Sequence, residues 1–176
     1  AQRDWGPVAP QVVKAWEWFE KGYSQYPTAH IFGYFGPMHD GPAWPLYLVP
    51  RRLPLAPTWQ IGYAPSGDYL AECITNGFAL DEVLTLCGRM AERWDRGVRI
   101  LKSLAPRVQS DPERVKEIGL ATALGLQFRS GHNILRFYSL REELADESEA
   151  AKRRQLLHAM REIVLQEVAV TEELIP

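Results

Sequence analysis

The chain contains only two cysteines, Cys73 and Cys87, and no CxxC pair among its 176 residues. Two cysteines are too few for the disulfide framework of a small secreted domain, and no Cys/His spacing predicts a zinc site. Cys73 and Cys87 could pair with each other or be two buried thiols, and we expect buried thiols. A P-loop, a dinucleotide fingerprint and a nucleophile elbow are also missing, so we expect no cofactor.

A strong net charge and a long apolar run are missing as well. The formal net charge is -2, which gives no long-range field to attract nucleic acid or an anionic membrane, so we expect neither as a partner. No apolar run approaches the roughly 18 residues that span a membrane. Residues 1–4 resemble neither a signal peptide nor a start methionine. We therefore expect a fragment of a larger protein, with no indication of its compartment.

Apolar residues recur every three or four positions in four stretches, which is the period of helices with one buried face. The stretches are residues 7–23, 80–104, 111–144 and 147–174. We expect Pro106 to close the second helix, and Ser110-Asp111-Pro112-Glu113 to open the third with a capping residue, a proline in the first turn and acidic residues. The predicted fold class is all-α: one helical module over residues 1–176, with a first helix in 1–26, a structured loop in 27–79 and a three-helix bundle in 80–176.

The third predicted helix carries apolar residues around much of its girth, so we expect it to be central or covered on several sides. Gly119, Gly125 and Gly131 lie inside it, and we expect close approach by another backbone or a kink there. Apolar positions on the first and third helices are expected to cover a neighbouring domain, which would leave a large apolar patch on the isolated chain.

Eight of the thirteen prolines lie between residues 27 and 65, so no long helix can form there. The stretch HIFGYFGPMHDGPAWPLY, residues 30–47, adds glycines and aromatics. Long segments without regular structure are uncommon in compact domains and are either functional or linkers, and the aromatics favour function. Gly36-Pro37 and Gly41-Pro42 would form a turn that projects His39 and Asp40.

Aromatic faces beside a carboxylate and an imidazole suit a sugar, whose apolar face stacks on a ring while its hydroxyls need donors and acceptors. Trp44 and Tyr47 supply such faces beside His39 and Asp40. The alternative is that the aromatics anchor the segment on the helices, because a loop must bury something to be ordered. Both can hold for different residues of the stretch.

A polar strip follows on the third helix, at steps of three and four: Arg129, His132, Asn133 and Arg136. These side chains either face a cleft formed with the loop or hydrogen-bond its unpaired backbone groups. Two carboxylate pairs, Asp68 with Glu72 and Glu162 with Glu167, are interpreted as solvated helix faces rather than catalytic pairs.

Several stretches, taken in order, carry a resemblance to a known family: DWGPVAPQVVKAWEWFEKGYSQYP, YFGPMHDGPAWPLY, RMAERWDRGVRILKSL and IGLATALGLQFRSGHNILRFYSLREEL. They resemble the C-terminal helical region of large bacterial proteins assigned as glycoside hydrolases. In that family a (β/α)-barrel catalytic domain precedes this region, and the Gly-Pro frame at residues 36–42 lies near the substrate. The chain differs from the family at Met38, His39 and Trp44.

The resemblance implies a helical module of a carbohydrate-active enzyme, with loop 30–47 at the substrate beside a catalytic barrel. The barrel would hold the carboxylate pair of glycoside hydrolysis, so we expect this chain alone not to be catalytic. The candidate substrate-binding residues are His39, Asp40, Trp44, Tyr47, Arg129 and Asn133. One alternative is a noncatalytic helical protein-protein interaction module. Another is a small free-standing enzyme that uses His39, Asp40, Arg129 or His132.

Overall fold

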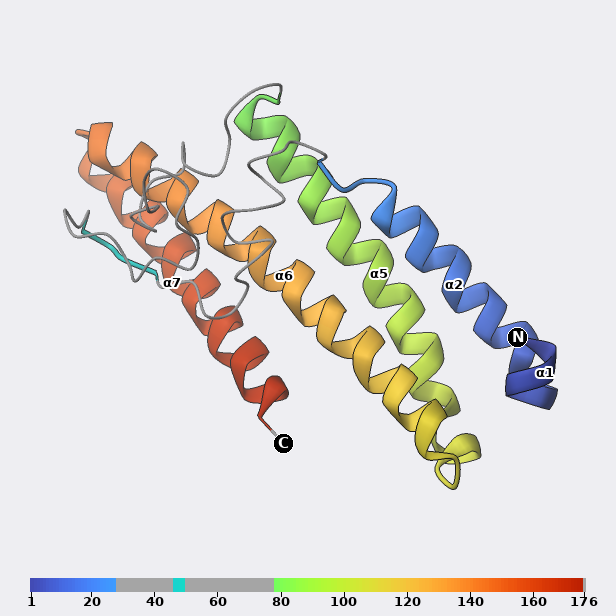
Figure 1. Ribbon diagram of the computed structural model, residues 1–176. Coiled ribbons are helices and arrows are strands. Elements are labelled where there is room, and N and C mark those ends of the chain that lie inside the picture. Colours follow the sequence, from blue (N-terminus) through green and yellow to red (C-terminus); the bar gives the residue numbers. More distant parts are fainter. Residues whose placement is uncertain (28–45, 50–77, 176) are drawn as a thin grey trace, which may run out of the picture. The chain divides into compact units, whose positions relative to one another are not determined.

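The computed structural model describes residues 1–27, 46–49 and 78–175, and this part of the chain is all-α (Figure 1). The predicted fold class, a bundle of about four helices, is confirmed. The helices are α1 (Gln2–Trp5), η1 (Gly6–Val8), α2 (Ala9–Tyr23), α5 (Leu80–Val108), α6 (Pro112–Asp146) and α7 (Ala150–Leu174). None of the described helices is long and apolar enough to cross a membrane.

The first predicted helix corresponds to α2, but helical turns begin earlier than expected. Gly6 has a φ of 49°, a left-handed conformation that glycine adopts without steric cost, and it separates α1 from η1. Pro7 follows in the first turn of η1, where its missing N–H costs no helix hydrogen bond. The chain therefore enters α2 through a short bend.

The ends of the later helices agree with the sequence to within a few residues. Pro106 lies inside the last turn of α5, which continues to Val108 instead of closing at the proline. The proline removes one hydrogen bond of the helix, and only two residues of α5 follow it, so the helix ends soon after the break. A capping residue opens α6 as predicted, and it is Asp111, whose Oδ1 accepts hydrogen bonds from the backbone N–H groups of Glu113 and Arg114 at 3.1 and 3.3 Å.

Helix α7 begins three residues later than predicted. The carboxylate of Glu147 accepts the backbone N–H of Glu149 at 2.8 Å, and the Arg153 guanidinium donates to the carbonyl oxygens of Leu144 and Glu147 at 2.9 and 2.7 Å. These bonds satisfy the backbone between α6 and α7. They hold residues 147–149 as a tight connection instead of a helical turn.

Contacts divide the chain into two compact units. Unit 1 consists of residues 1–26 and 85–129, and unit 2 of residues 27–84 and 130–176. Helix α6 supplies its first half to unit 1 and its second half to unit 2. The sequence-based division at residues 26 and 79 stays a prediction.

The core of unit 1 is built from α1, η1, α2, α5 and the first half of α6. Its buried cluster comprises Trp5, Val8, Ala9, Val12, Ala15, Leu101, Leu104, Ile118 and Ala121. Figure 1 shows α2 lying along α5, which brings the apolar faces read from the sequence together. This cluster explains the apolar period of α2.

Trp94 of α5 contacts both neighbouring helices of unit 1. Its ring stacks on Phe19 of α2, with centroids 4.3 Å apart, and meets Phe128 of α6 edge-on at 5.0 Å. The indole N–H donates a hydrogen bond of 2.8 Å to the carbonyl oxygen of Ala121. A half-buried tryptophan with its N–H satisfied combines large apolar burial with a fixed orientation.

Glycines allow these helices to approach closely. A Cβ on Gly97 would lie 2.8 Å from the Ala15 carbonyl oxygen and would overlap the Phe19 ring, and one on Gly22 would lie 3.1 Å from the backbone nitrogen of Trp94. A Cβ on Gly125 would meet side chains of α5, with the nearest atom of Trp94 at 3.1 Å, and no backbone of another helix is among its nearest neighbours. The expected close approach of another backbone is therefore wrong for Gly125, and also for Gly119, where no atom lies within 4 Å of a Cβ position.

Some apolar residues that the periodicity assigned to the core are exposed. Trp16 of α2 is 43% exposed and Leu120 of α6 is 64% exposed. Along α6, no residue from 125 to 141 is exposed, whereas most residues from 112 to 124 are. The expectation of a centrally placed third helix therefore holds for its second half, and the first half is covered on one face.

We expect Gly97→Ala to lower the free energy of unfolding by about 1 to 3 kcal/mol, because the added methyl would force α2 away from α5. Urea unfolding followed by circular dichroism measures the change. Gly119→Ala is the matched control: with open space around it, alanine should raise stability by up to about 1 kcal/mol. Equal effects of the two variants would contradict the close packing of α2 on α5.

Candidate functional site

The buried polar and charged residues of the described chain all lie in unit 2. They are Ser130, Asn133, Arg141 and Glu167. Burial of such groups is unfavourable unless hydrogen bonds replace those to water. Each of these groups therefore needs hydrogen-bond partners, which are found around Glu167 and around Arg141.

Glu167 of α7 is only 9% exposed and is held by two neutral donors from α6. The Ser130 hydroxyl donates to Oε2 at 2.6 Å, and the Asn133 side-chain amide donates to Oε1 at 2.8 Å. In the part of the chain that the structure describes, no cation pairs with this carboxylate. The three side chains form a closed polar contact between α6 and α7.

The interpretation of Glu167 as part of a solvated helix face is wrong. Glu167 occupies a core position of α7, in a row of buried residues at alternating steps of four and three: Leu156, Met160, Ile163, Glu167 and Val170. A carboxylate in such a row must find donors on the facing helix. The position of Glu167 within an apolar row is the signal in the sequence that could have predicted its burial. No signal in the sequence predicts the role of Ser130.

The polar strip on α6 does not converge on one site. Arg129, in unit 1, donates to both carboxylate oxygens of Asp95 on α5 at 2.9 Å. Asn133, in unit 2, donates to Glu167 of α7. The described hydrogen bonds of Arg129 and Asn133 thus go to carboxylates of neighbouring helices. The sequence predicted either a cleft formed with the loop or hydrogen bonds to the loop's backbone, and neither prediction included these carboxylates.

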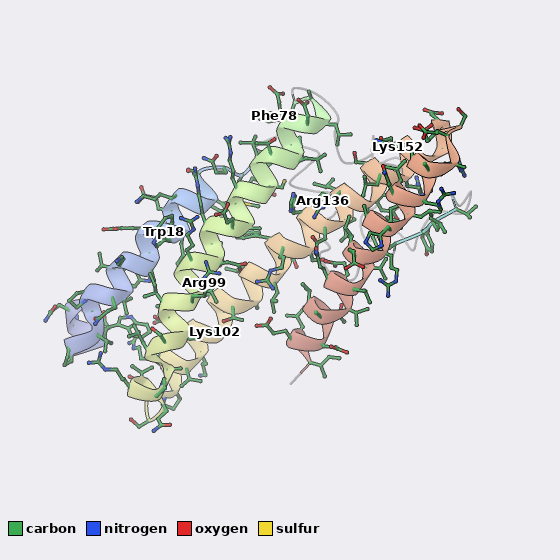
Figure 2. The ribbon with its side chains drawn as sticks, turned by 180° about the vertical axis from the view of Figure 1, so that it is seen from behind. Trp18, Phe78, Arg99, Lys102, Arg136 and Lys152 are labelled. Carbon is green, nitrogen blue, oxygen red and sulfur yellow. The ribbon has the colours of Figure 1, made fainter. Side chains whose placement is uncertain are left out.

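His132 lies in the same half of α6 and is half-buried. Burial and, to a lesser extent, the positive charge of Arg136 lower the pKa of His132 from 6.5 to about 4. Figure 2 shows Arg136 on the same helix. His132 and Arg136 are four positions apart, which places their side chains on one face of the helix. At neutral pH His132 is therefore an uncharged imidazole.

The end of the aromatic stretch contacts α6 within unit 2. The backbone N–H of Tyr47 donates to the Tyr138 hydroxyl oxygen at 3.3 Å, and the Tyr47 carbonyl accepts from the Arg141 guanidinium at 3.3 Å. Arg141 also lies over the Tyr138 ring, 4.6 Å from its centroid, and pairs with Glu142 at 2.7 Å. Both backbone groups of Tyr47 are thus bound by buried side chains of one helix.

Of the six candidate substrate-binding residues, three lie outside the described residues: His39, Asp40 and Trp44. Tyr47, Arg129 and Asn133 are described. The backbone of Tyr47 binds Tyr138 and Arg141, the side chain of Arg129 binds Asp95, and the side chain of Asn133 binds Glu167. Sequence reasoning missed Tyr138 and Arg141, which bind Tyr47. No signal in the sequence distinguishes them, because this part of α6 also contains Arg136, Ser139, Glu142 and Glu143.

The one described cysteine, Cys87, is a free, buried thiol, as expected. Burial raises its pKa to about 12, so at neutral pH the nucleophilic thiolate form is scarce. Cys73 lies outside the described residues. Among residues 1–27, 46–49 and 78–175, no group of three or more His, Cys, Asp or Glu side chains could hold a metal ion.

The Ser130–Asn133–Glu167 contact has the residue types of a nucleophile and base, but its donors and acceptors are bound to one another inside the helix pair. A catalytic base must reach a substrate proton, and Ser130 is fully buried. The contact instead fixes the register of α7 on α6, a role for which buried polar groups are well suited. No family model, curated protein or solved structure matches the chain.

We expect Glu167→Leu to lower the free energy of unfolding by about 2 to 4 kcal/mol, because it leaves the Ser130 hydroxyl and the Asn133 amide buried without an acceptor. Urea unfolding would measure it. Glu162→Leu, one turn away at an exposed position, should change stability by less than about 0.5 kcal/mol. The triple variant Ser130→Ala/Asn133→Leu/Glu167→Leu should regain most of the loss; a triple variant no more stable than Glu167→Leu would contradict this.

We also expect His132 to make the chain acid-sensitive. Because its pKa is about 4 when folded and about 6.5 when unfolded, the unfolded chain binds more protons between these values, and stability falls as the pH falls from 6.5 to 4. The full contribution is up to about 3 kcal/mol. His132→Gln should flatten the pH dependence of the free energy of unfolding in this window.

Exposed His158 of α7 provides the control, since His158→Gln also removes one histidine from the chain. The prediction concerns the difference in the free energy of unfolding between wild type and His132→Gln. Carboxylates titrate in both proteins, so their contribution to the pH dependence cancels in this difference. An NMR titration in which the His132 ring protonates near pH 6.5 would contradict it.

Proposed function

We propose that the chain is a helical module of a carbohydrate-active enzyme of the glycoside hydrolase type. In this proposal segment 30–47 contributes to substrate binding, and a catalytic barrel of the same parent protein supplies the reaction. The observation that carries it is the attachment of Tyr47, at the end of that segment, to Tyr138 and Arg141 of α6. Ligand-binding loops are typically held in this way by rigid helices.

The attachment supports a binding role because its partners are buried. Arg141 is only 4% exposed, and burial of a guanidinium is unfavourable unless its partners are well placed. Two buried side chains, Tyr138 and Arg141, bind the backbone of one residue, Tyr47. A loosely attached loop would not need two such contacts. The chemistry of the segment, with aromatic rings beside His39 and Asp40, suits a sugar.

A division of work between this chain and a barrel is consistent with the described side chains. Glycoside hydrolysis requires two carboxyl groups that flank the glycosidic bond. The buried carboxylate Glu167 is bound to Ser130 and Asn133, and Asp95 is bound to Arg129. In this proposal the acid and the nucleophile or base come from the barrel.

Contact with a further domain is supported by exposed apolar residues of unit 1. On α2 these include Val13 and Trp16, and on α6 Val115 and Leu120. Apolar residues on two elements of one unit are typical of surfaces that another domain covers. In this proposal they face the upstream catalytic domain.

A second candidate function, a noncatalytic protein-protein interaction module, is favoured by one feature of α7. Leu157, Val164 and Val168 are all exposed, between 38% and 49%, and share a face of the helix next to its buried row. Exposed aliphatic rows of this kind are typical of helix-binding surfaces. A monomeric chain that retains no protein partner would count against this candidate.

We expect the chain to bind neutral oligosaccharides, with Trp44→Ala and His39→Ala each weakening the affinity about tenfold, as measured by calorimetry or tryptophan fluorescence. Tyr138→Phe removes the hydroxyl that accepts the Tyr47 N–H without removing a sugar contact. It should weaken binding about fivefold, the equivalent of one hydrogen bond.

Trp16→Ala is the matched control, because it removes an exposed tryptophan from unit 1 and leaves segment 30–47 intact. Its affinity should equal that of the wild type. The proposal fails if neutral mono- and oligosaccharides produce no change in fluorescence or NMR shifts, or if Trp44→Ala binds as tightly as the wild type.

A further inference from the structure

Helix α5 carries five arginines on one side, outside its row of buried residues. This row, which we call the α5 stripe, consists of Arg89, Arg93, Arg96, Arg99 and Arg107. At 1.5 Å per residue it extends over about 27 Å. Figure 2 shows Arg99 and Lys102 along α5, with Trp18 on the neighbouring helix α2. All of these residues belong to unit 1.

The near-neutral charge of the whole chain conceals this surface. Unit 1 contains twelve Lys and Arg residues against eight Asp and Glu, a formal charge of +4, and unit 2 contains eight against fourteen, a formal charge of -6. These values add to the net charge of -2 for the chain. A ligand at unit 1 therefore meets a positive local field that the total charge does not indicate.

Few carboxylates neutralise the α5 stripe. Between Arg89 and Arg107 the helix has two acidic residues, Glu92 and Asp95. Glu92 pairs with Arg96, and Asp95 pairs with Arg129 of α6. Arg89, Arg99 and Arg107 are exposed and make no ion pair with a described residue. Three guanidinium groups thus remain available to an anion.

Neighbouring side chains fix the centre of the stripe. Arg96 lies over the Trp18 ring, 4.8 Å from its centroid, and Lys21 lies 5.2 Å from the same centroid. Arg93 donates a hydrogen bond of 3.0 Å to the Lys21 carbonyl oxygen. These cation–π and hydrogen-bond contacts hold Arg93 and Arg96 in place, so their charges stay beside the three exposed arginines.

The composition of the stripe disfavours a protein partner. Protein interfaces are centred on apolar and aromatic anchors in desolvated contacts. The exposed large apolar residues of the described chain lie on other elements, and none lies on α5. A line of solvated guanidinium groups instead suits a hydrated, linear anion, since guanidinium binds carboxylates in a bidentate geometry.

We propose that the α5 stripe binds an acidic polysaccharide built from uronic acids, whose ring carboxylates pair with Arg89, Arg99 and Arg107. The choice of a saccharide among linear anions rests on the proposed function. Single-stranded DNA, a linear anion that carries phosphates in place of carboxylates, is the alternative that the test distinguishes. The surface lies in unit 1 and is distinct from segment 30–47.

The test measures binding of the chain to oligogalacturonate by calorimetry. The triple variant Arg89→Gln/Arg99→Gln/Arg107→Gln should weaken binding about tenfold, since three exposed ion pairs are lost. A rise in sodium chloride from 50 to 500 mM should weaken wild-type binding more than that of the variant. Glutamine preserves helix propensity, and circular dichroism checks that the variant is folded.

The matched control removes three arginines elsewhere: Arg3→Gln/Arg154→Gln/Arg161→Gln has the same net charge and should bind within about twofold of the wild type. Absence of oligogalacturonate binding would overturn the proposal. So would an equal loss in both triple variants, or binding of polyglutamate or single-stranded DNA as tightly as oligogalacturonate.

The test separates this inference from the proposed function. Binding of neutral oligosaccharides that depends on Trp44, without oligogalacturonate binding, would overturn the inference and leave the proposed function standing. Oligogalacturonate binding that depends on Arg99, without any effect of Trp44→Ala on neutral or acidic sugars, would support the stripe and overturn the role of segment 30–47. Absence of all saccharide binding would overturn both.

Discussion

The packing of Trp94 is the interaction on which unit 1 depends. The ring meets Phe19 of α2 and Phe128 of α6, and its N–H is bound by a carbonyl oxygen of α6. Gly22 and Gly125 leave the room that this packing requires. Because Trp94 points inward, the rotation of α5 about its axis is fixed, and Arg89, Arg99 and Arg107 point outward. The charged surface of α5 is thus a consequence of its aromatic core.

Unit 2 contains the buried polar contacts of the described chain. Glu167 is bound by Ser130 and Asn133, and the backbone of Tyr47 is bound by Tyr138 and Arg141. Apolar packing tolerates small displacements, whereas buried hydrogen bonds require defined distances and angles. The second half of α6 therefore provides a more specific support for segment 30–47 than apolar burial alone would, and this is the basis of the proposed binding role.

The helices could be predicted from the sequence because each carries an apolar period and identifiable end signals. The Asp111 cap and the ends of α2 and α7 at Tyr23 and Leu174 follow from local chemistry. Burial was less predictable, since Trp16 and Leu120 fit the period but are exposed. Periodicity shows which face can be buried, and only the arrangement of neighbouring helices decides which face is.

The candidate site was predicted only in part for a similar reason. Arg129 and Asn133 were identified as polar residues on an apolar helix, but their partners, Asp95 and Glu167, lie 34 residues away in each case. Spacing along one helix carries no information about the helix that faces it. Tyr138 was counted as an apolar residue, because a hydroxyl on a ring does not disturb the apolar period.

The opposite formal charges of the two units have a consequence at the isoelectric point, near pH 6.1. There the chain as a whole has no net charge, yet unit 1 keeps an excess of guanidinium groups and unit 2 an excess of carboxylates. Unit 1 of one molecule then attracts unit 2 of another. Because the net charge of each molecule is zero, no repulsion between whole molecules opposes this attraction. Solubility near the isoelectric point should therefore increase with added salt, which screens that attraction.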